Sequence, residues 1–276
     1  MTVLGGPVQG RVLIVAGSDS GGGAGVQADI KTVTALGGFA ASAVTALTAQ
    51  DTFGVHEVLP VEPTFVARQI ELVLADIGAD AIKTGMLCDA GVIDAVADVL
   101  GRMARDVPLV LDPVMVAKGG RQLLDRNAVA SLKRRLILRA RVITPNLPEA
   151  EVLADCAIET REALIDTAQG LLALGCKAVF LKGGHFPGRT VADVLASADG
   201  VEVFEYPRIE TNNTHGTGCT LASAIATGLA QGLSLRDSVA RARAYVQEAI
   251  RTAPAIGHGH GPLNHGHTVR PFGIPK

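Results

Sequence analysis

Short runs rich in apolar residues alternate with longer segments of helical periodicity along most of this chain. The run 11–16 (RVLIVA) is apolar at every position after the first, as in a strand buried on both faces of a sheet. The predicted strands are 11–16, 39–49, 79–84, 109–111, 141–144 and 178–182; the predicted helices are 24–36, 63–77, 89–100, 126–136, 161–174 and 235–252, with others starting at 148 and near 217. This alternation predicts an α/β fold with a mainly parallel sheet and helices on both faces.

Two segments in the C-terminal third have a different pattern. Residues 191–196 and 201–206 flank Asp199-Gly200, which predicts an antiparallel hairpin. We find no internal repeat and no linker composition. The sequence therefore predicts a single domain over residues 1–276.

Composition narrows the class of protein. The chain is 48% hydrophobic with a net charge of −2, and its only basic cluster is 133–135, so we expect no nucleic-acid partner. The four cysteines are scattered without Cys-x-x-Cys spacing, which argues against a disulfide framework or zinc site and favours a reducing cytoplasm. No uncharged apolar run reaches the roughly 18–20 residues of a membrane span, and the first residues do not form a signal peptide. We expect a soluble cytoplasmic protein.

Polar residues and glycines follow the predicted strands. In open parallel sheets, ligands bind at the carboxyl ends of strands. The residues at these ends are Gly17–Asp19, Gln50, Lys83–Met86, Asp112, Asn146–Glu149 and Lys182–His185. We therefore expect these residues to form one ligand site.

The segment 211–231 (TNNTHGTGCTLASAIATGLAQ) leads from a polar loop into an Ala-rich helix. Thr214 or Thr217 is the expected N-cap, which leaves the first backbone N–H groups of the helix free to bind an anion. A cysteine at this terminus, Cys219, is predicted to have a lowered pKa. The alternative is a plain helix start with a buried, inert cysteine.

Each remaining candidate also has a purely structural interpretation. Asp29 could be a solvated or capping acid, Gln50 and Asp112 could stabilise turns, and Asn146 with Glu149 could be a helix cap and a first-turn acid. The glycines of 17–38 match neither G-x-G-x-x-G nor a P-loop, which disfavours a Rossmann oxidoreductase. The tail histidines, 258, 260, 265 and 267, have no nearby carboxylate or cysteine, so we do not expect zinc there.

Several blocks of sequence are familiar as a set. They are GSDSGGGAGVQADIKT, TALTAQDTFGV, IKTGML, LDPVM, AKGG, ITPNLPEA, LKGGH, NTHGTGCTLASAIA and GHGHGPLNH, in this order. The chain resembles the hydroxymethylpyrimidine/phosphomethylpyrimidine kinases of thiamine biosynthesis, a branch of the ribokinase-like superfamily. The resemblance runs from about Arg11 to His267, so the leader 1–10 and the tail 268–276 lie outside it.

The resemblance implies a three-layer ribokinase-like fold, a homodimer, and ATP- and Mg²⁺-dependent phosphorylation. The expected substrates are 4-amino-5-hydroxymethyl-2-methylpyrimidine and its monophosphate, which becomes the diphosphate. The residues expected to contact the pyrimidine are Gly17, Asp29, Gln50, Met86 and Val114; those expected to bind the nucleotide are Lys182, Thr214 and His215; those expected to organise the metal are Asn146, Glu149 and Asp112. Lys118-Gly119-Gly120 matches a flap that closes over the substrate.

The catalytic group implied by the resemblance is the loop Gly216-Thr217-Gly218-Cys219, which we call the anion loop. Its amides would stabilise the charge on the transferred phosphate. Cys219 occupies the position where other superfamily members have a catalytic aspartate, so a thiolate could accept the hydroxyl proton in the first step. The second step attacks with an ionised phosphate oxygen. We therefore predict that Cys219→Ala damages the first step more than the second.

Two other functions remain open from the sequence. A pyridoxal or pyridoxine kinase of the same branch has the same cysteine loop, although Gln50 and Met86 favour the pyrimidine. A non-catalytic protein that binds a pyrimidine or vitamin would keep Asp29 and Gln50. It would need neither the anion loop nor Asn146 and Glu149, and all of these are present.

Overall fold

The computed structural model describes residues 9–116, 120, 123–270 and 273, and their strands form one mixed sheet. The strands are β1 Arg11–Asp19, β2 Phe39–Gln50, β3 Val55–Pro60, β4 Ala81–Thr84, β5 Leu109–Leu111, β6 Val142–Ile143, β7 Ala178–Leu181, β8 Thr190–Ser197 and β9 Gly200–Pro207. They are arranged in the order β3-β2-β1-β4-β5-β6-β7-β8-β9, and the six central strands run parallel. The predicted parallel sheet and the β8–β9 hairpin are confirmed. Strand β3, antiparallel to β2, was not anticipated.

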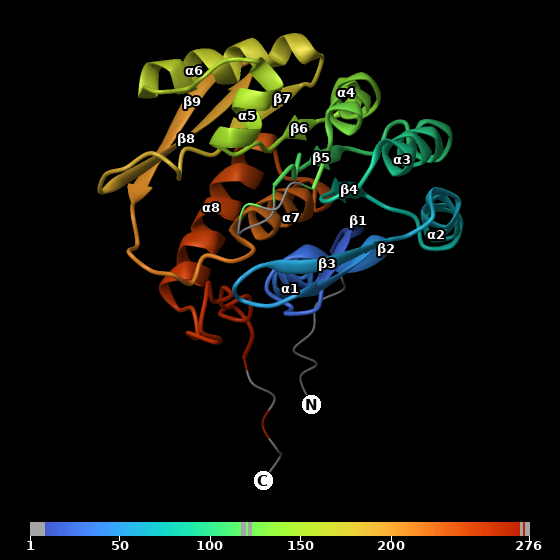
Figure 1. Ribbon diagram of the computed structural model, residues 1–276, viewed down its shortest axis with the longest axis horizontal. Coiled ribbons are helices and arrows are strands. Elements are labelled where there is room, and N and C mark those ends of the chain that lie inside the picture. The colour runs from blue at the N-terminus through green and yellow to red at the C-terminus, as the bar shows by residue number, and fades with distance from the viewer. Residues whose placement is uncertain (1–8, 117–119, 121–122, 271–272, 274–276) are drawn as a thin grey trace.

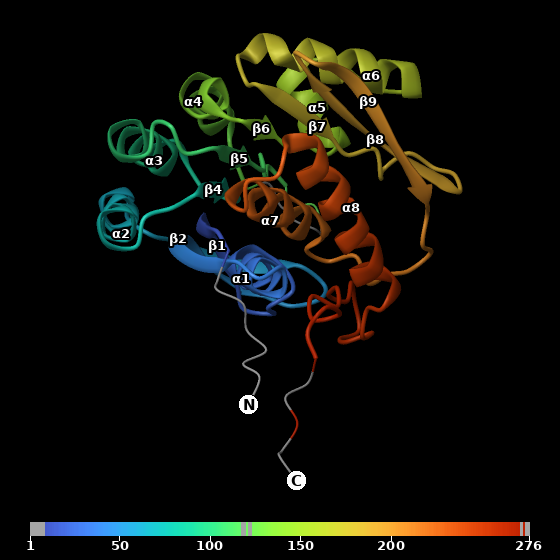
Figure 2. The same ribbon diagram turned by 180° about the vertical axis from the view of Figure 1, so that it is seen from behind.

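Helices cover both faces of the sheet (Figure 1, Figure 2). They are α1 Gly25–Ala35, α2 Pro63–Asp76, α3 Ala90–Met103, α4 Arg126–Arg135, α5 Leu147–Ala154, α6 Arg161–Gly170, α7 Thr217–Ala230 and α8 Leu235–Arg251, with the 3₁₀ turns η1 Ile137–Arg139 and η2 Leu171–Leu174. Helices α2 to α6 lie on one face and α1, α7 and α8 on the other. This is the three-layer arrangement expected from the sequence.

The alternation of side chains along β1 builds the two halves of the core. Leu13 and Val15 belong to the apolar cluster under α2 to α6, whereas Val12 and Ile14 belong to the cluster under α1, α7 and α8. Successive side chains of a strand point to opposite faces, so a strand buried on both faces is apolar throughout. For this reason the run 11–16 could be recognised in the sequence.

Helix α7 is buried along most of its length and supports the centre of the sheet. Residues 220–228 are all buried, which explains why this helix is apolar on every side. Small residues let α8 approach closely, because a Cβ added at Gly228 would lie 2.7 Å from Cβ of Ser238. The body of α7 is therefore held in place by packing against the sheet and α8.

The start of α7 differs from the prediction. The N-cap is Gly216 in the left-handed conformation (φ 82°), without a side-chain cap, so the expected cap at Thr214 or Thr217 is wrong. Thr217 Oγ1 instead donates to the carbonyl of Thr214 at 2.7 Å. The fold requires glycine here because a Cβ at Gly216 would lie 1.9 Å from the oxygen of Gly23.

Lys118 and Gly119 of the expected flap lie outside the described residues. Among the helices that the structure describes, none combines the length and the apolar character needed to span a bilayer.

Candidate active site

A cavity of about 750 Å³ opens at the carboxyl ends of the parallel strands. The predicted site residues that line it are Gly17, Gln50, Met86, Asp112, Val114, Asn146, Glu149, Lys182, Thr214, His215, Gly216, Thr217, Gly218 and Cys219. The strand ends thus converge on one cavity as expected, and the binding of a ligand there stays a prediction. Among the predicted site residues, Asp29 is the exception, as described below.

Two glycine-containing segments pack backbone to backbone at the floor of this cavity. Gly25 has a φ of 55°, and a Cβ there would lie 2.4 Å from the oxygen of Gly17. A Cβ at Gly216 would lie even closer to the oxygen of Gly23, at 1.9 Å. As a result the N-termini of α1 and α7 both reach the cavity, and the backbone N–H of Gly25 donates to the Cys219 sulfur.

A lysine–aspartate pair lies against the first turn of α7. Lys182 Nζ is 3.0 Å from Asp112 Oδ1, which also accepts a hydrogen bond from Thr144 Oγ1 at 2.9 Å. A Cβ added at Gly218 would lie 3.2 Å from Lys182 Nζ and 3.7 Å from Asp112 Oδ2. Burial lowers the pKa of Lys182, but the carboxylates of Asp112 and Glu149 outweigh it, so the pKa is raised and the ammonium stays charged. The ammonium and the helix N-terminus together suit an anion such as phosphate.

Asn146 and Glu149 form a capping box at the start of α5. Asn146 Oδ1 accepts from the Glu149 N–H at 2.9 Å, and Glu149 Oε2 accepts from the Asn146 N–H at 2.8 Å. The structural interpretation that the sequence left open is therefore correct for both residues. Burial raises the pKa of Glu149 to about 7, and the Asp112 carboxylate adds to this effect against the Lys182 ammonium.

The carboxylates of Asp112 and Glu149 could also bind a divalent cation. Among the described residues, no group of three or more His, Cys, Asp or Glu side chains could hold a metal ion by itself. Magnesium, however, commonly binds to one or two carboxylates and completes its shell with substrate phosphates and water. Asp112 and Glu149 line the cavity beside Lys182 and fit that donor set, whereas the Asn146 oxygen already caps the helix.

The apolar part of the cavity wall includes Gly17, Met86 and Val114. A Cβ added at Gly17 would lie 3.2 Å from the Met86 sulfur, so glycine leaves room for a flat ligand beside that side chain. The backbone of Met86 is fixed by a hydrogen bond from Thr45 Oγ1 to its carbonyl at 2.6 Å. These residues can stack against a planar ring.

Asp29 lies beneath the cavity and does not line it. Its Oδ2 is 2.7 Å from Lys83 Nζ, and its Oδ1 accepts from Ser223 Oγ at 2.7 Å. Asp29 and Lys83 are both 0% exposed. The expectation that Asp29 contacts the pyrimidine is therefore not met, because both carboxylate oxygens are already bonded within the core.

Lys83, which sequence reasoning did not single out, does line the cavity. Burial lowers its pKa, but the carboxylates of Asp29 and Asp112 and the Cys219 sulfur outweigh it, so the pKa is raised. The sequence AIKT (81–84) could have predicted a buried ion pair, because a lysine in a buried strand needs an ionic partner. The position of that partner could not be read from the sequence.

The pKa of Cys219 differs from the expectation. Burial raises the pKa of the thiol to about 11, and the carboxylates of Asp29 and Asp112 contribute to the rise. The Lys83 ammonium and the Gly25 N–H act in the opposite direction and do not compensate. The predicted lowering is therefore wrong for this structure, since desolvation outweighs the helix terminus. The resting side chain is a thiol at neutral pH.

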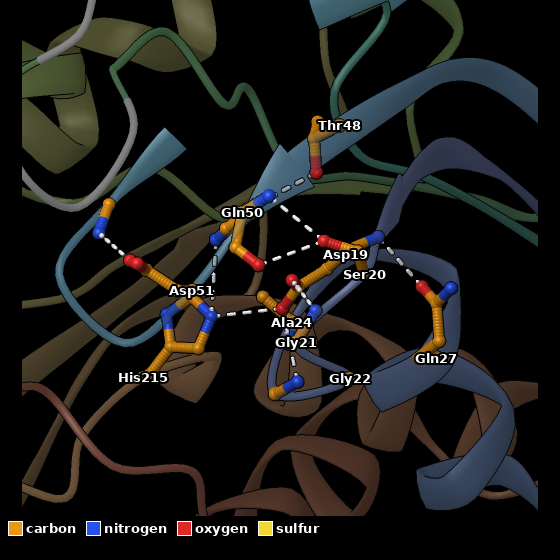
Figure 3. Close-up of polar contacts among 12 residues, drawn as sticks. Asp19, Ser20, Gly21, Gly22, Ala24, Gln27, Thr48, Gln50, Asp51 and His215 are labelled. Carbon is orange, nitrogen blue, oxygen red and sulfur yellow. Dashed lines mark hydrogen bonds and ion pairs between the residues drawn. The ribbon is translucent and has the colours of Figure 1, made fainter. Parts of the chain in front are cut away.

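His215 was expected to meet the nucleotide, but it lies beside Gln50, a residue expected at the substrate (Figure 3). Its Nε2 is 3.0 Å from Asp19 Oδ2 and 3.2 Å from Gln50 Nε2. Asp19 was visible in the sequence only as a strand-end residue. Thr214, the neighbour of His215, lines the cavity as expected.

A second polar cluster of the cavity wall was missed entirely. Asp193 Oδ2 accepts from the Tyr206 hydroxyl at 2.9 Å and lies 3.1 Å from Arg243 Nε. The Arg243 guanidinium stacks 3.6 Å from the centre of the Tyr206 ring. These residues come from β8, β9 and α8, and no spacing in the sequence connects them.

Known proteins are similar to this chain in sequence and in fold. A family model described as phosphomethylpyrimidine kinase matches residues 19–264. The hydroxymethylpyrimidine/phosphomethylpyrimidine kinase of Escherichia coli is 44% identical over 260 residues, covering 93% of this chain and 97% of that protein. The thiamine biosynthesis bifunctional protein ThiED of Geobacter sulfurreducens is 52% identical over 257 residues, which are 93% of this chain but only 52% of that longer protein.

The solved structures include kinases of a second substrate. The pyridoxal kinase of Staphylococcus aureus, in complex with AMP-PCP and pyridoxal, aligns with a TM-score of 0.87 at 31% identity and covers 95% of each chain. Its fold supports the ribokinase-like architecture, and its complex with a nucleotide analogue supports the use of ATP. The family model and the sequence identities together show that the chain belongs to the phosphomethylpyrimidine kinase family.

Proposed function

We propose that this chain transfers phosphate from ATP to 4-amino-5-hydroxymethyl-2-methylpyrimidine, and then to the monophosphate to give the diphosphate, in thiamine biosynthesis. The observation that carries the proposal is the shared cavity. Lys182 and the Gly216–Cys219 amides line it together with Gln50 and Met86. A phosphate site and a site for a planar ring are thereby brought into one space.

The residues around the first turn of α7 would act on the transferred phosphate. The moving phosphoryl group carries its charge on its oxygens, so positioning and charge stabilisation dominate the catalysis. The Lys182 ammonium and the backbone amides at the start of α7 supply both. We propose that Asp112 and Glu149 hold Mg²⁺, which neutralises phosphate charge when it is bound.

The residues of the apolar wall would hold the pyrimidine. Gln50 offers one donor and one acceptor, which can pair with a ring nitrogen and the adjacent amino group of an aminopyrimidine. Gly17, Met86 and Val114 line the cavity where a flat ring can stack. The hydroxymethyl group then points to the anion loop, where Cys219 lies close to the path of its proton.

Pyridoxal is the second candidate substrate. The observation that favours it is the close structural match to a pyridoxal kinase, with a TM-score of 0.87. Both substrates carry a hydroxymethyl group on a planar nitrogen ring of similar size. The relatives named for the pyrimidine are 44% and 52% identical to this chain, against 31% for the pyridoxal kinase, and we therefore prefer the pyrimidine.

Identification of the products by mass spectrometry tests the proposal. The purified protein is given ATP and Mg²⁺ with the pyrimidine, its monophosphate or pyridoxal in separate reactions. We expect conversion of both pyrimidines, with the monophosphate going to the diphosphate. Conversion of pyridoxal alone would show that the substrate assignment is wrong, and absence of ATP consumption with all three would point to a binding protein.

We also propose a single kinase domain that acts as a homodimer in the cytoplasm. Leu47 and Leu59 are directly paired across β2 and β3 and are 49% and 64% exposed, which leaves an apolar surface suited to a second copy of the chain. All four cysteines are free thiols, in keeping with a reducing compartment. Sedimentation equilibrium of the wild type and of Leu59→Lys tests the dimer; an unchanged mass would place the interface elsewhere.

A further inference from the structure

The ring of His215 is held between two polar side chains of the substrate end of the cavity (Figure 3). Its Nε2 lies 3.0 Å from Asp19 Oδ2 and 3.2 Å from the side-chain nitrogen of Gln50. His215 is 8% exposed and Asp19 is 2% exposed. Water therefore has little access to the contact between His215 and Asp19, so the donors and acceptors of these two side chains must match each other.

The ionisation state of Asp19 determines whether His215 Nε2 carries a proton. Asp19 accepts hydrogen bonds from three backbone N–H groups, those of Gly21, Gly23 and Ala24, at 2.8, 3.0 and 2.7 Å. Burial raises the pKa of Asp19, but His215 and the N–H groups of Ala24 and Gly21 outweigh it, so the pKa is lowered and the carboxylate is ionised. An ionised carboxylate only accepts, so His215 Nε2 must carry a hydrogen and donate it.

The hydrogen bonds of Thr48 determine which amide atom of Gln50 faces Thr48. Thr48 Oγ1 lies 2.8 Å from the Ser18 carbonyl and 3.1 Å from the side-chain oxygen of Gln50. A hydroxyl has one proton, and the carbonyl of Ser18 can only accept it. Once that proton is used, Thr48 Oγ1 presents a lone pair to Gln50.

Both neighbours of Gln50 thus require the same orientation of its amide. The N–H of His215 requires the Gln50 amide oxygen opposite it, and the lone pair of Thr48 Oγ1 requires the Gln50 amide nitrogen. The amide group is therefore rotated by 180° about its terminal bond relative to the contacts given above. The two orientations have nearly the same shape, and the hydrogen-bond network alone separates them. In the turned orientation no two donors and no two lone pairs face each other: the single Nε2–H of His215 is shared between Asp19 Oδ2 and the Gln50 oxygen, and one proton of the Gln50 amide points to Thr48 Oγ1.

We propose that Asp19 and His215 form a positioning pair that fixes the amide of Gln50 with its carbonyl toward His215. The amide then keeps one acceptor and one donor free for the ring of the substrate, in a fixed order. That order matters because the hydroxymethyl group must face the anion loop, so the ring cannot turn over to correct a mismatch. The proposal rests on the proposed function for the identity of the ring.

The surrounding backbone holds the histidine ring in the one place where it can do this. A Cβ added at Gly23 would lie 2.4 Å from His215 Cδ2, so the ring packs directly on the glycine-rich loop. The backbone N–H of His215 donates to the carbonyl of Gly261 at 3.1 Å. The backbone of Gln50 is fixed as well, since its N–H donates to Ser20 Oγ at 2.9 Å.

The test is a double-mutant cycle on His215 and Gln50, read as the dissociation constant of the hydroxymethylpyrimidine by calorimetry without ATP. His215→Leu removes the N–H, and we expect pyrimidine binding to weaken about tenfold, as for the loss of one buried hydrogen bond. His215→Gln restores an N–H donor, and we expect at least half of the loss on a logarithmic scale to be recovered. In the Gln50→Leu background, His215→Leu should add less than about twofold.

The remaining outcomes separate this role from others. The KM for ATP should change by less than about twofold in His215→Leu; a rise in that KM with unchanged pyrimidine binding would overturn the proposal in favour of a nucleotide contact. An equal loss in both Gln50 backgrounds would overturn it in favour of a general structural role. If His215→Leu does not fold, His215→Phe keeps a planar ring against Gly23 without the N–H, and the same cycle applies.

Failure of the proposed function has a different signature. It would appear as wild-type protein that yields no phosphorylated pyrimidine, whereas the cycle is read from binding without turnover. A wild type that does not bind the pyrimidine at all would overturn the positioning role together with the substrate assignment. Binding without turnover would leave the cycle fully interpretable.

Discussion

Raising the pH separates a thiolate mechanism at Cys219 from one that does not need a thiolate. Burial, assisted by the carboxylates of Asp29 and Asp112, raises the pKa of this thiol to about 11 despite the Lys83 ammonium. The thiolate fraction falls tenfold for each pH unit below the pKa, so about one molecule in 3,000 carries a thiolate at a pH of about 7.5. The proton acceptor invoked for the first phosphorylation is therefore scarce in the resting enzyme.

The two phosphorylations should respond differently. If the Cys219 thiolate accepts the proton of the hydroxymethyl group, the rate of the first step is proportional to the thiolate fraction and rises about tenfold per pH unit between about pH 7 and 9. The second step attacks with a phosphate oxygen whose pKa is about 6, so that oxygen is already ionised over this range. We expect the ratio of the first rate to the second to rise about 100-fold over the two units.

The ratio of the first rate to the second is measured because other groups in the cavity titrate in the same pH range and would affect each rate alone. Burial raises the pKa of Glu149 to about 7, and its ionisation should affect both steps alike. The assay is product formation with saturating ATP and Mg²⁺ at constant ionic strength, followed by mass spectrometry for each pyrimidine. Cys219→Ser is the matched control, since a hydroxyl of similar size should slow the first step and flatten its ratio to the second.

A ratio that stays flat in the wild type would refute the thiolate mechanism, or the pKa on which the magnitude rests. Alkylation of Cys219 by iodoacetamide, resolved by peptide mass spectrometry, separates these two explanations. A thiol with a pKa of about 11 reacts tenfold faster per pH unit up to about pH 9.5 without levelling off. The exposed Cys156 provides the internal reference.

Three other substitutions test the core of the site. Lys83→Met leaves the Asp29 carboxyl buried without its ion-pair partner, and the free energy of unfolding in urea should fall by about 3–5 kcal/mol; an unchanged midpoint would contradict this. Gly216→Ala places a methyl group 1.9 Å from the Gly23 oxygen at a φ of 82°, so melting temperature and activity should both fall. The control Gly101→Ala has open space around it and lies within helix α3, so it should lower neither and should stabilise the fold slightly. Burial raises the pKa of Glu149 from 4.5 to about 7, so the folded state retains a proton that the unfolded state releases in this window. Wild-type stability should therefore decrease as the pH rises from about 4.5 to 7, and Glu149→Gln should lose less; equal urea midpoint shifts would contradict this.

The fold was predictable from the sequence wherever a rule of periodicity or topology acts locally. The strand 109–111 and the hairpin around Asp199-Gly200 follow from apolar runs and turn residues. The convergence of strand ends on one cavity follows from the parallel sheet itself. Strand β3 could not be found in this way, because it is short, lies at the edge and is largely exposed.

The electrostatics of the site could not be predicted, because they depend on contacts between distant segments. Asp29 pairs with Lys83 across 54 residues of sequence, and Asp19 meets His215 across 196 residues. The lowered pKa expected for Cys219 considered only the start of its own helix. Burial of the thiol, with a smaller contribution from the carboxylates of Asp29 and Asp112 on other elements, reverses the direction of the shift.

The glycine-rich segment 17–25 shows how these long-range contacts explain a local pattern. Its spacing matches no nucleotide-binding fingerprint, and the reason lies in what it packs against. A side chain at position 25 would collide with the Gly17 oxygen, and one at position 216 would collide with the Gly23 oxygen. A side chain at position 23 would collide with the His215 ring. The segment is therefore rich in glycine because it must carry the anion loop and the histidine that positions Gln50. A single substitution there is expected to disturb the phosphate end and the substrate end of the cavity together.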